Sequence, residues 1–469
     1  MSLETDPIQQ EASTIPRVES PYEGKRLTIG DHFKISSYWF ATNFLWGALL
    51  VIMLPGEIRT LFPEYRVPAL GYLFAFGAVV ALVVPLIAGA LSDRCASRWG
   101  RRRPYMAAGI AINVVGLILM QTAVSVSPVV HGNRDDSASK IASTLFSSQT
   151  FWFLLLAYMV AQLGNNIASA AYSGVIPDLV PEDQRGTASG WMALMSQLGT
   201  LFGAVGAGVL MGGMSEALKY VVISVVLLAV GSITVFGIRE NPLPGKPEPI
   251  SWGLYIKSLW INPKKYPDFA WVWITRAFVM LGFYAVLPFI NYYLIDVIGI
   301  AEKDVDAKAS MLIGVILITS SISGVYGGVV SDKIGRKKVV YIANCTIAVM
   351  TLAFVFCKDI NQVLAAGVLF GLGFGAYTSV DWALGTDVLP SKKDAAKEMA
   401  VWHIAMTLPQ SIAAPIAGII IAKFGFTVVH GEEKDIVHYT QMGYGVTFAL
   451  CAVLFAMGAY FLRNVRGVK

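Results

Sequence analysis

Twelve stretches of about 20 or more residues that are poor in charged side chains constrain the fold of this 469-residue sequence more than any other feature. Runs of this length span a bilayer as helices, because a helix satisfies its own backbone N–H and C=O groups, which find no hydrogen-bond partner in lipid. Only 14% of the residues are charged, against roughly 25% in soluble domains, so a soluble globule is excluded. The expected spans are 34–57, 68–92, 104–125, 150–176, 185–210 and 217–238, followed by 270–297, 309–330, 338–357, 361–387, 397–423 and 441–462.

Positive side chains are distributed unevenly between the two sides of such a bundle. The tails and the even-numbered loops hold 25 of the 36 Lys and Arg residues, the opposite loops hold ten, and Arg276 lies inside a span. Loops rich in Lys and Arg stay in the cytoplasm, so both termini are expected to be cytoplasmic and the protein to reside in the cell membrane. Because the net charge of +5 is small and sorted by side, it indicates no nucleic-acid partner.

A proline-rich stretch after the sixth span divides the chain into two sets of six spans. An aromatic and apolar segment, 251–260, follows these prolines. It suits either a short helix in the cytoplasmic interface or a simple connector. The expected organisation is a disordered cytoplasmic tail (1–32), an N-terminal six-helix bundle (33–239), a linker with an interfacial helix (240–268), a C-terminal six-helix bundle (269–463) and a short cytoplasmic tail (464–469).

The two sets of spans carry the same loop motif. After the second span stands GALSDR at 89–94, followed by GRRRP at 100–104, and after the eighth stands GVVSDKIGRKK at 328–338. A second echo follows two spans later, with PDLVP at 177–181 against TDVLP at 386–390. Repeated halves in the same orientation are typical of transporters whose halves rock about a central site. We therefore expect an all-α integral membrane protein with twelve transmembrane helices in two pseudo-symmetric six-helix bundles around a central cavity.

The loop G-x-x-S-D-R/K, followed by G-R-R/K, resembles the cytoplasmic loop motif of the major facilitator superfamily. Within that superfamily, the stretched first copy at 92–104 is similar to the plant sucrose:proton symporters and their animal and bacterial relatives. The pair Asn165-Asn166 on the fourth span and the run RENP at 239–242 look similar too. The resemblance implies the major facilitator fold and proton-driven transport of a sucrose-like disaccharide or related glycoside. Gln162 stands where the plant proteins carry an aspartate, three residues before the Asn pair.

The repeated loop predicts an ion-pair latch on the cytoplasmic side. Small residues after spans two and eight let two helices approach closely, and the Asp of each copy can meet the N-terminus of a helix from the other half. Because such contacts form when the cytoplasmic side is closed, they should stabilise the outward-facing state. The alternative is that these bases only fix topology and bind anionic lipid headgroups. The expected latch joins Arg101 or Arg102 to Asp178 and Arg336 to Asp387, beside Gly89, Asp93, Gly328 and Asp332.

Spans one, four, seven and ten line the central cavity in this superfamily, and here they carry residues that a sugar requires. Amides match the hydroxyls of a sugar ring, and aromatic planes match its C–H face. Gln162, Asn165 and Asn166 fall at i, i+3 and i+4 on one helical face. The alternative is that these amides only bond neighbouring helices and that the aromatic residues fill the core or the interface. The candidate substrate-binding residues are Asn43, Trp46, Tyr158, Gln162, Asn165, Asn166, Tyr284, Asn291, Tyr292, Tyr377 and Trp382.

Asp381 is the only acid well inside an expected span, about 9 Å from the end of span ten at 1.5 Å per residue. Arg276 lies at a similar depth on span seven, so we expect the two to form an ion pair. Asp381 is then the candidate proton carrier, since the neutral Gln162 occupies the plant position. The open alternative is a permanent salt bridge that braces the two spans.

Three classes of function follow from these features. The first is a proton-coupled sugar importer, and the second is a transporter of another cargo, such as an uncoupled facilitator or a proton-driven exporter. A membrane enzyme or receptor is the third, but no hydrolase or metalloprotease motif supports it, and the four cysteines lack metal-ligand spacing. No enzyme activity, metal or cofactor is therefore expected. The expected partners are a sugar, protons and the lipid bilayer, and the expected state is a monomer.

Overall fold

The computed structural model describes residues 19–132, 138–245, 250–253, 261–389, 395–429 and 436–466. Twelve of its helices are long and apolar enough to cross a membrane. The twelve expected spans are therefore confirmed. The largest difference at a helix start is in the eighth span, which begins at Glu302, seven residues before the expected residue 309, because the helix extends past its apolar part. Glu302 and Asp304 lie in its first turn, where acidic side chains stabilise a helix N-terminus.

The first six spans form the N half. Its first span contains a π-helical turn, η1, and its fifth span ends in another, η3. In chain order the elements are α2 (Ile29–Ala48), η1 (Leu49–Met53), α3 (Leu54–Leu61), α4 (Arg66–Asp93), α5 (Arg103–Val126), α6 (Ala138–Ser147), α7 (Gln149–Ser173), α8 (Val175–Leu179), η2 (Glu182–Gln184), α9 (Arg185–Val205), η3 (Gly206–Leu210) and α10 (Glu216–Gly237).

The last six spans form the C half. Its first span is interrupted by a 3-10 turn, η4, and a two-stranded antiparallel hairpin precedes its last span. In chain order the elements are α12 (Pro267–Val286), η4 (Leu287–Phe289), α13 (Ile290–Asp296), α14 (Glu302–Ile334), α15 (Arg336–Phe356), α16 (Ile360–Asp387), α17 (Ala395–Gly425), β1 (Phe426–Val429), β2 (Ile436–Tyr439), α18 (Gln441–Phe461) and η5 (Leu462–Asn464).

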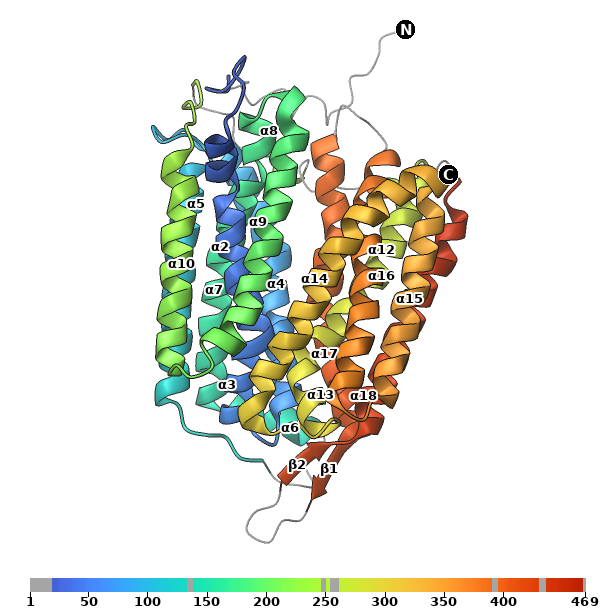
Figure 1. Cartoon of the computed structure of the whole chain (residues 1–469). Helices are drawn as coiled ribbons and strands as arrows, with labels where there is room; N and C mark the ends of the chain where they lie inside the picture. Colours follow the sequence, from blue (N-terminus) through green and yellow to red (C-terminus); the bar gives the residue numbers. More distant parts are fainter. Residues whose placement is uncertain are drawn as a thin grey trace.

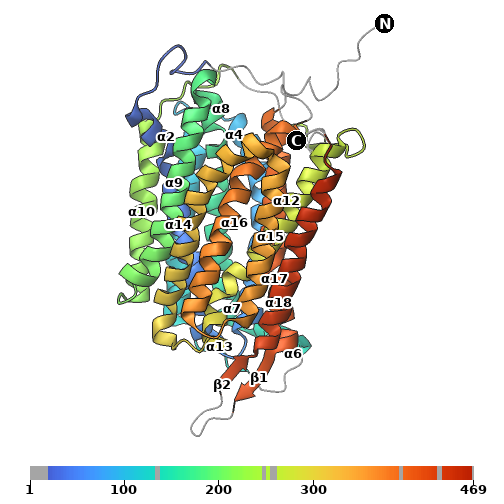
Figure 2. The ribbon, with the colours of Figure 1, turned by 45° about the vertical axis from the view of Figure 1, so that its right-hand side comes forward.

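The two halves stand side by side as separate bundles, blue to green and yellow to red (Figures 1 and 2). Ser20 Oγ donates to the carbonyl of Leu179 at 2.6 Å, and the amide of Arg466 donates to Asp268 at 2.8 Å. Figure 1 shows that both ends of the described chain lie on one side of the bundle, which we call the termini side. The β1–β2 hairpin projects from the opposite side, which we call the hairpin side (Figure 1).

Small residues let the helices of each half approach closely. A Cβ atom on Gly116 of α5 would overlap the backbone of Ala161 in α7, and one on Gly164 of α7 would overlap the backbone of α5. In the C half, a Cβ atom on Gly375 of α16 would overlap the backbone of Ser320 in α14. These contacts fix the fourth and tenth spans, α7 and α16, which carry most of the polar residues expected at the site.

The halves meet mainly through α4 against α17 and through α9 and η3 against α14. A Cβ atom on Gly71 of α4 would lie 3.6 Å from the Cα of Pro415 in α17. One on Gly208 of η3 would overlap Ser310 of α14. Gly71, Gly208 and Ser310 all lie near the hairpin-side ends of their spans. The halves are therefore closely packed on the hairpin side.

The expectation of a disordered tail over 1–32 is wrong from residue 19 onward. The amide of Leu27 donates to Gln184 Oε1 at 2.8 Å, and the Leu27 side chain is buried. Thr28 and Asp31 form a capping box at the start of α2, which satisfies its free amides. Residues 1–18 and most of the expected interfacial helix, 254–260, lie outside the described residues.

Candidate functional site

Three amides form a polar row on one face of α7. Asn166 Nδ2 donates to the backbone oxygen of Gln162 at 2.8 Å and to its Oε1 at 3.2 Å. Gln162 Nε2 donates to the hydroxyl of Tyr158 at 2.8 Å, and Asn165 Oδ1 accepts from Thr42 Oγ1 of α2 at 2.6 Å. All three amide residues are half-buried. The amide row of Gln162, Asn165 and Asn166 therefore presents ordered donors and acceptors that remain partly accessible.

Aromatic residues from neighbouring spans border the amide row. The ring of Trp46 lies edge-on to Tyr158 with 6.4 Å between centroids, and Phe74 of α4 packs against the same tyrosine. Asn43 is turned elsewhere, because its Oδ1 accepts from Thr200 Oγ1 of α9 at 3.4 Å. The structure thus brings Trp46 and Tyr158 to the row, and it places Asn43 against the fifth span.

Arg276 of α12 and Asp381 of α16 form a buried ion pair, and each residue is 2% exposed. The hydroxyl of Tyr377 donates to Asp381 Oδ1 at 3.2 Å. The guanidinium carbon of Arg276 lies 4.4 Å from the ring centre of Trp402 and 5.8 Å from that of Trp382. Neutralising Asp381 would leave the Arg276 charge buried without its carboxylate, which is a strongly destabilising arrangement.

The three residues expected at the site from span seven do not come together. Tyr284 is half-buried in α12. Asn291 and Tyr292 lie beyond the turn η4, and both are fully buried. Asn291 Nδ2 donates to Asp306 Oδ1 at 3.4 Å, and the Tyr292 hydroxyl donates to the carbonyl of Pro55 in the N half at 2.9 Å. The break at η4 therefore places Asn291 and Tyr292 near or in the contact between the halves, and not beside the amide row.

A buried ion pair joins the two halves on the hairpin side. Arg66, the first residue of α4, pairs with Asp296, the last residue of α13, and their side chains are 5% and 0% exposed. The hydroxyl of Tyr444 donates to Asp296 Oδ2 at 2.7 Å. The Arg66 guanidinium carbon lies 5.4 Å from the ring centre of Tyr292 and 5.6 Å from that of Tyr439. We call these five residues the hairpin-side cluster. Removing one partner of a buried pair leaves an uncompensated buried charge and costs about 3–5 kcal/mol, so this contact between the halves depends on both partners.

The sequence did not reveal the hairpin-side cluster. Arg66 and Asp296 are 230 residues apart and belong to no repeated motif. Each stands at the end of a span, where a charge is normally interpreted as a topology signal. The only available signal was that an acid and a base end spans on the same expected side.

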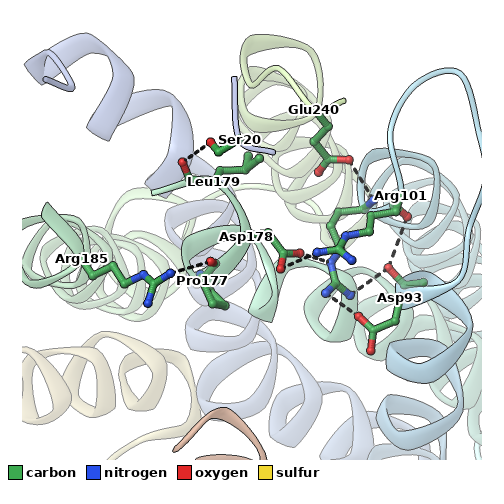
Figure 3. A network of polar contacts seen from close by, with 10 residues as sticks. Ser20, Asp93, Arg101, Pro177, Asp178, Leu179, Arg185 and Glu240 are labelled. Carbon is green, nitrogen blue, oxygen red and sulfur yellow. Dashed lines mark hydrogen bonds and ion pairs between the residues drawn. The ribbon is translucent and has the colours of Figure 1, made fainter. Parts of the chain in front are cut away.

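On the termini side, the first loop motif forms a network of ion pairs (Figure 3). Arg101 Nη2 lies 2.6 Å from Asp178 Oδ1, and Arg102 Nε lies 2.8 Å from Asp178 Oδ2. Arg102 also pairs with Asp93 at 2.5 Å. Both candidate bases therefore meet Asp178, and the network connects the start of α5 with α4 and α8.

Glu240, from the RENP run at 239–242, holds the base of this network in place. Its Oε2 accepts from the amide of Arg102 at 2.9 Å. Gly100 has φ +97°, and a Cβ atom there would overlap the Glu240 carboxylate, so glycine is required for two reasons. Burial raises the pKa of the Glu240 carboxyl, and the amides of Arg102 and Arg103 oppose this by bonding the charged form. The RENP run at 239–242 therefore provides a structural contact between the end of α10 and the first loop motif.

The second loop motif forms a smaller version of the network. Arg336 Nη1 lies 2.8 Å from Asp387 Oδ2, while Asp332 is exposed. A Cβ atom on Gly328 would lie 3.2 Å from a side chain of α16, so a close approach exists there. At Gly89, by contrast, no described atom lies within 4 Å of such a Cβ, and the expected close approach is missing. The ion pairs of each network lie within one half, and a link between halves through them stays a prediction.

Two repeated six-span halves, packed together on one side, define the class of membrane transporters built from repeats. The family described as MFS/sugar transport protein matches residues 65–463. This match covers most of the chain, so the chain belongs to that family. The expected membership in the major facilitator superfamily is thereby confirmed.

Comparison with individual proteins adds more distant similarities. The sucrose transport protein SUC3 of Arabidopsis thaliana is 25% identical over 168 residues, which are 35% of this chain and 27% of that protein. The general alpha-glucoside permease of Schizosaccharomyces pombe is 28% identical over 127 residues, which are 27% of this chain and 21% of that protein. The chain thus matches less than a third of the length of these relatives.

Among solved structures, a D-xylose-proton symporter matches 93% of this chain and 98% of its own with a TM-score of 0.62. The identity over this match is 14%, so the similarity shows the fold alone.

Proposed function

We propose that this chain is a secondary transporter of a sugar that works by alternating access. The observation that carries this proposal is the buried pair of Arg66 and Asp296, which joins two repeated bundles on the hairpin side. Interfaces of this kind exist in two discrete arrangements, because buried ion pairs are either formed or broken. Rocking of one half against the other would break this pair and open the bundle on the hairpin side.

The amide row on α7 is the proposed sugar site. Its half-buried donors and acceptors suit ring hydroxyls, and Trp46 offers an aromatic plane nearby. We propose a sucrose- or maltose-like disaccharide or a related glycoside as substrate. The printed functions of the two relatives, sucrose transport and α-glucoside transport, support this choice.

We further propose that import is coupled to protons, with Asp381 and Arg276 as the coupling pair. A proton on Asp381 would release Arg276 from its only described carboxylate partner and change the contact between α12 and α16. The second candidate function is an uncoupled facilitator or an exporter. It is favoured by Gln162, which cannot carry a proton charge, and by Asp381, whose two carboxylate oxygens already have Tyr377 and Arg276 as partners.

The termini side is proposed to face the cytoplasm, with the protein in the cell membrane as a monomer. The uneven distribution of Lys and Arg supports this orientation. We propose that the two termini-side networks act as latches that stabilise the state closed on that side.

Counterflow in proteoliposomes tests the proposed function. Vesicles preloaded with unlabelled sucrose, maltose or glucose are diluted into the labelled sugar, with and without an inward pH gradient. We expect transient accumulation of at least one disaccharide without a gradient, and sustained accumulation when the outside is acidic. Counterflow without sustained accumulation would identify an uncoupled facilitator, and no counterflow of any of the three sugars would contradict the proposed substrate class.

A further inference from the structure

Glu57 is a buried acid that the sequence did not single out, since it stands at the very end of the expected first span. The structure places it inside that span, in α3, with 3% of its surface exposed. The hydroxyl of Tyr220 in α10 donates to Glu57 Oε2 at 2.8 Å. Glu57 Oε1 is buried and has no hydrogen-bond partner in the described part of the chain. Asp381 is therefore not the only acid well inside a span, and the expectation from the sequence is wrong on this point.

Glu57 differs from the other buried acids of the spans in its partners. Asp296 is paired with Arg66, and Asp381 is paired with Arg276. Among the described ion pairs none includes Glu57. An isolated carboxylate in a buried site costs several kcal/mol and normally takes up a proton instead.

The charged groups around Glu57 already have other partners. Two of them lie on α10, where Lys219 Nζ is 2.8 Å from Glu216 Oε1. These two groups of opposite charge are the ionised neighbours of Glu57 on α10. Arg59, two residues along α3, lies 4.0 Å from Glu302 of the C half. Glu57 thus has a hydroxyl donor and no cation of its own.

The helix that carries Glu57 also takes part in the hairpin-side closure. The carbonyl of Pro55 accepts from the hydroxyl of Tyr292, which belongs to the hairpin-side cluster. Separation of the halves on this side would break this bond and the contact of Arg59 with Glu302. If water then enters between α3 and α10, the carboxylate of Glu57 is hydrated, whereas burial in the closed arrangement disfavours the charged form.

We propose that Glu57 is a proton-binding site linked to closure of the hairpin side. A proton from water on that side binds a carboxylate oxygen of Glu57 as the halves close, and it returns to water when they open. The closed state therefore binds one proton more than the open state, so lowering the pH favours closure. With one linked proton, the ratio of closed to open molecules changes by up to about tenfold per pH unit.

This linkage is measured as a distance between spin labels on the two halves. Labels at Met214→Cys and Lys303→Cys report the hairpin side of the full chain in lipid nanodiscs, after the four native cysteines are replaced by alanine. We expect the short-distance population to grow between pH 8 and pH 5.5 in the wild-type background. In Glu57→Gln, the short distance should dominate at both pH values.

The control is Asp359→Asn, which neutralises an exposed acid at the hairpin-side end of α16 and should leave the pH dependence unchanged. A pH dependence that persists in Glu57→Gln, or that is absent from the wild type, overturns the proposal. If Glu57→Gln does not fold, Tyr220→Phe replaces it, because loss of the bonded hydroxyl must move the pH of the transition. An unmoved transition would then overturn the proposal. No substrate is needed, so the result does not depend on the proposed sugar transport.

Discussion

At the scale of single residues, Asp381 is where coupling and structure are hardest to separate. Asp381→Asn keeps the volume of the side chain and an acceptor for the Tyr377 hydroxyl, but it removes the proton site. We expect lower expression because the buried Arg276 loses its carboxylate, and in the protein that folds we expect sustained, gradient-driven sugar accumulation to be lost while counterflow continues. Both activities are measured in the same vesicles, and Asp359→Asn, at the N-cap of the same helix, serves as the matched control. Joint loss of expression and of both activities would identify the pair with Arg276 as a brace instead.

The amide row gives a second prediction at this scale. Asn166→Ala removes a side chain that donates to Gln162 and is partly accessible. Loss of one hydrogen bond to a sugar hydroxyl costs about 0.5–1.5 kcal/mol, so the half-saturating sugar concentration in counterflow should rise roughly twofold to twelvefold. Asn43→Ala is the contrast, because Asn43 bonds Thr200 of α9, and it should leave that concentration nearly unchanged. Equal effects of the two substitutions would argue against the amide row as the sugar site.

The contacts of single residues were predictable where the spacing along one helix or the depth in the membrane determines which side chains meet. The row on α7 follows from the helical period, and the pairing of Arg276 with Asp381 follows from equal depth in two spans. Glu57 and the Arg66–Asp296 pair were not accessible in this way. Their surroundings depend on how the two halves pack, and no periodic pattern in the sequence records that packing.

At the scale of elements, the termini-side networks predict matched behaviour of the two repeats. Asp178→Asn and Asp387→Asn each remove the carboxylate that holds the loop bases, so both should shift the population toward the state open on the termini side. Asp178→Asn should also lower the free energy of unfolding by about 1–3 kcal/mol, since Arg102 is buried and loses a partner. Accessibility of single cysteines on the termini side, with thermal unfolding in parallel, measures both effects. Unchanged accessibility in both variants would leave the networks as structural contacts within each half.

The helices themselves were predictable because a charge-poor run of about 20 residues has few alternatives to a membrane span. The local departures from α-helical geometry within the spans were not predictable. The turns η1 and η3 adopt π geometry and η4 adopts 3-10 geometry within apolar sequence that also suits a regular helix. The position of η4 decides that Asn291 and Tyr292 belong to the region where the halves meet.

At the scale of the whole molecule, alternating access requires two halves that open on one side as they close on the other. The sequence repeat indicated the two halves, but not which side the structure would hold closed, because that depends on contacts between residues far apart in the chain. Asp296→Asn weakens the hairpin-side cluster by leaving Arg66 buried without its carboxylate. We expect it to favour the state that is open on the hairpin side.

The most direct test measures both sides of one molecule. Spin labels at Met214→Cys and Lys303→Cys report the hairpin side, and labels at Thr187→Cys and Lys333→Cys report the termini side, since all four positions are exposed. On introducing Asp296→Asn, alternating access predicts a longer hairpin-side distance together with a shorter termini-side distance. A hairpin-side distance that lengthens while the termini-side distance stays fixed, or two distances that do not change, would contradict alternating access by rocking of the two halves.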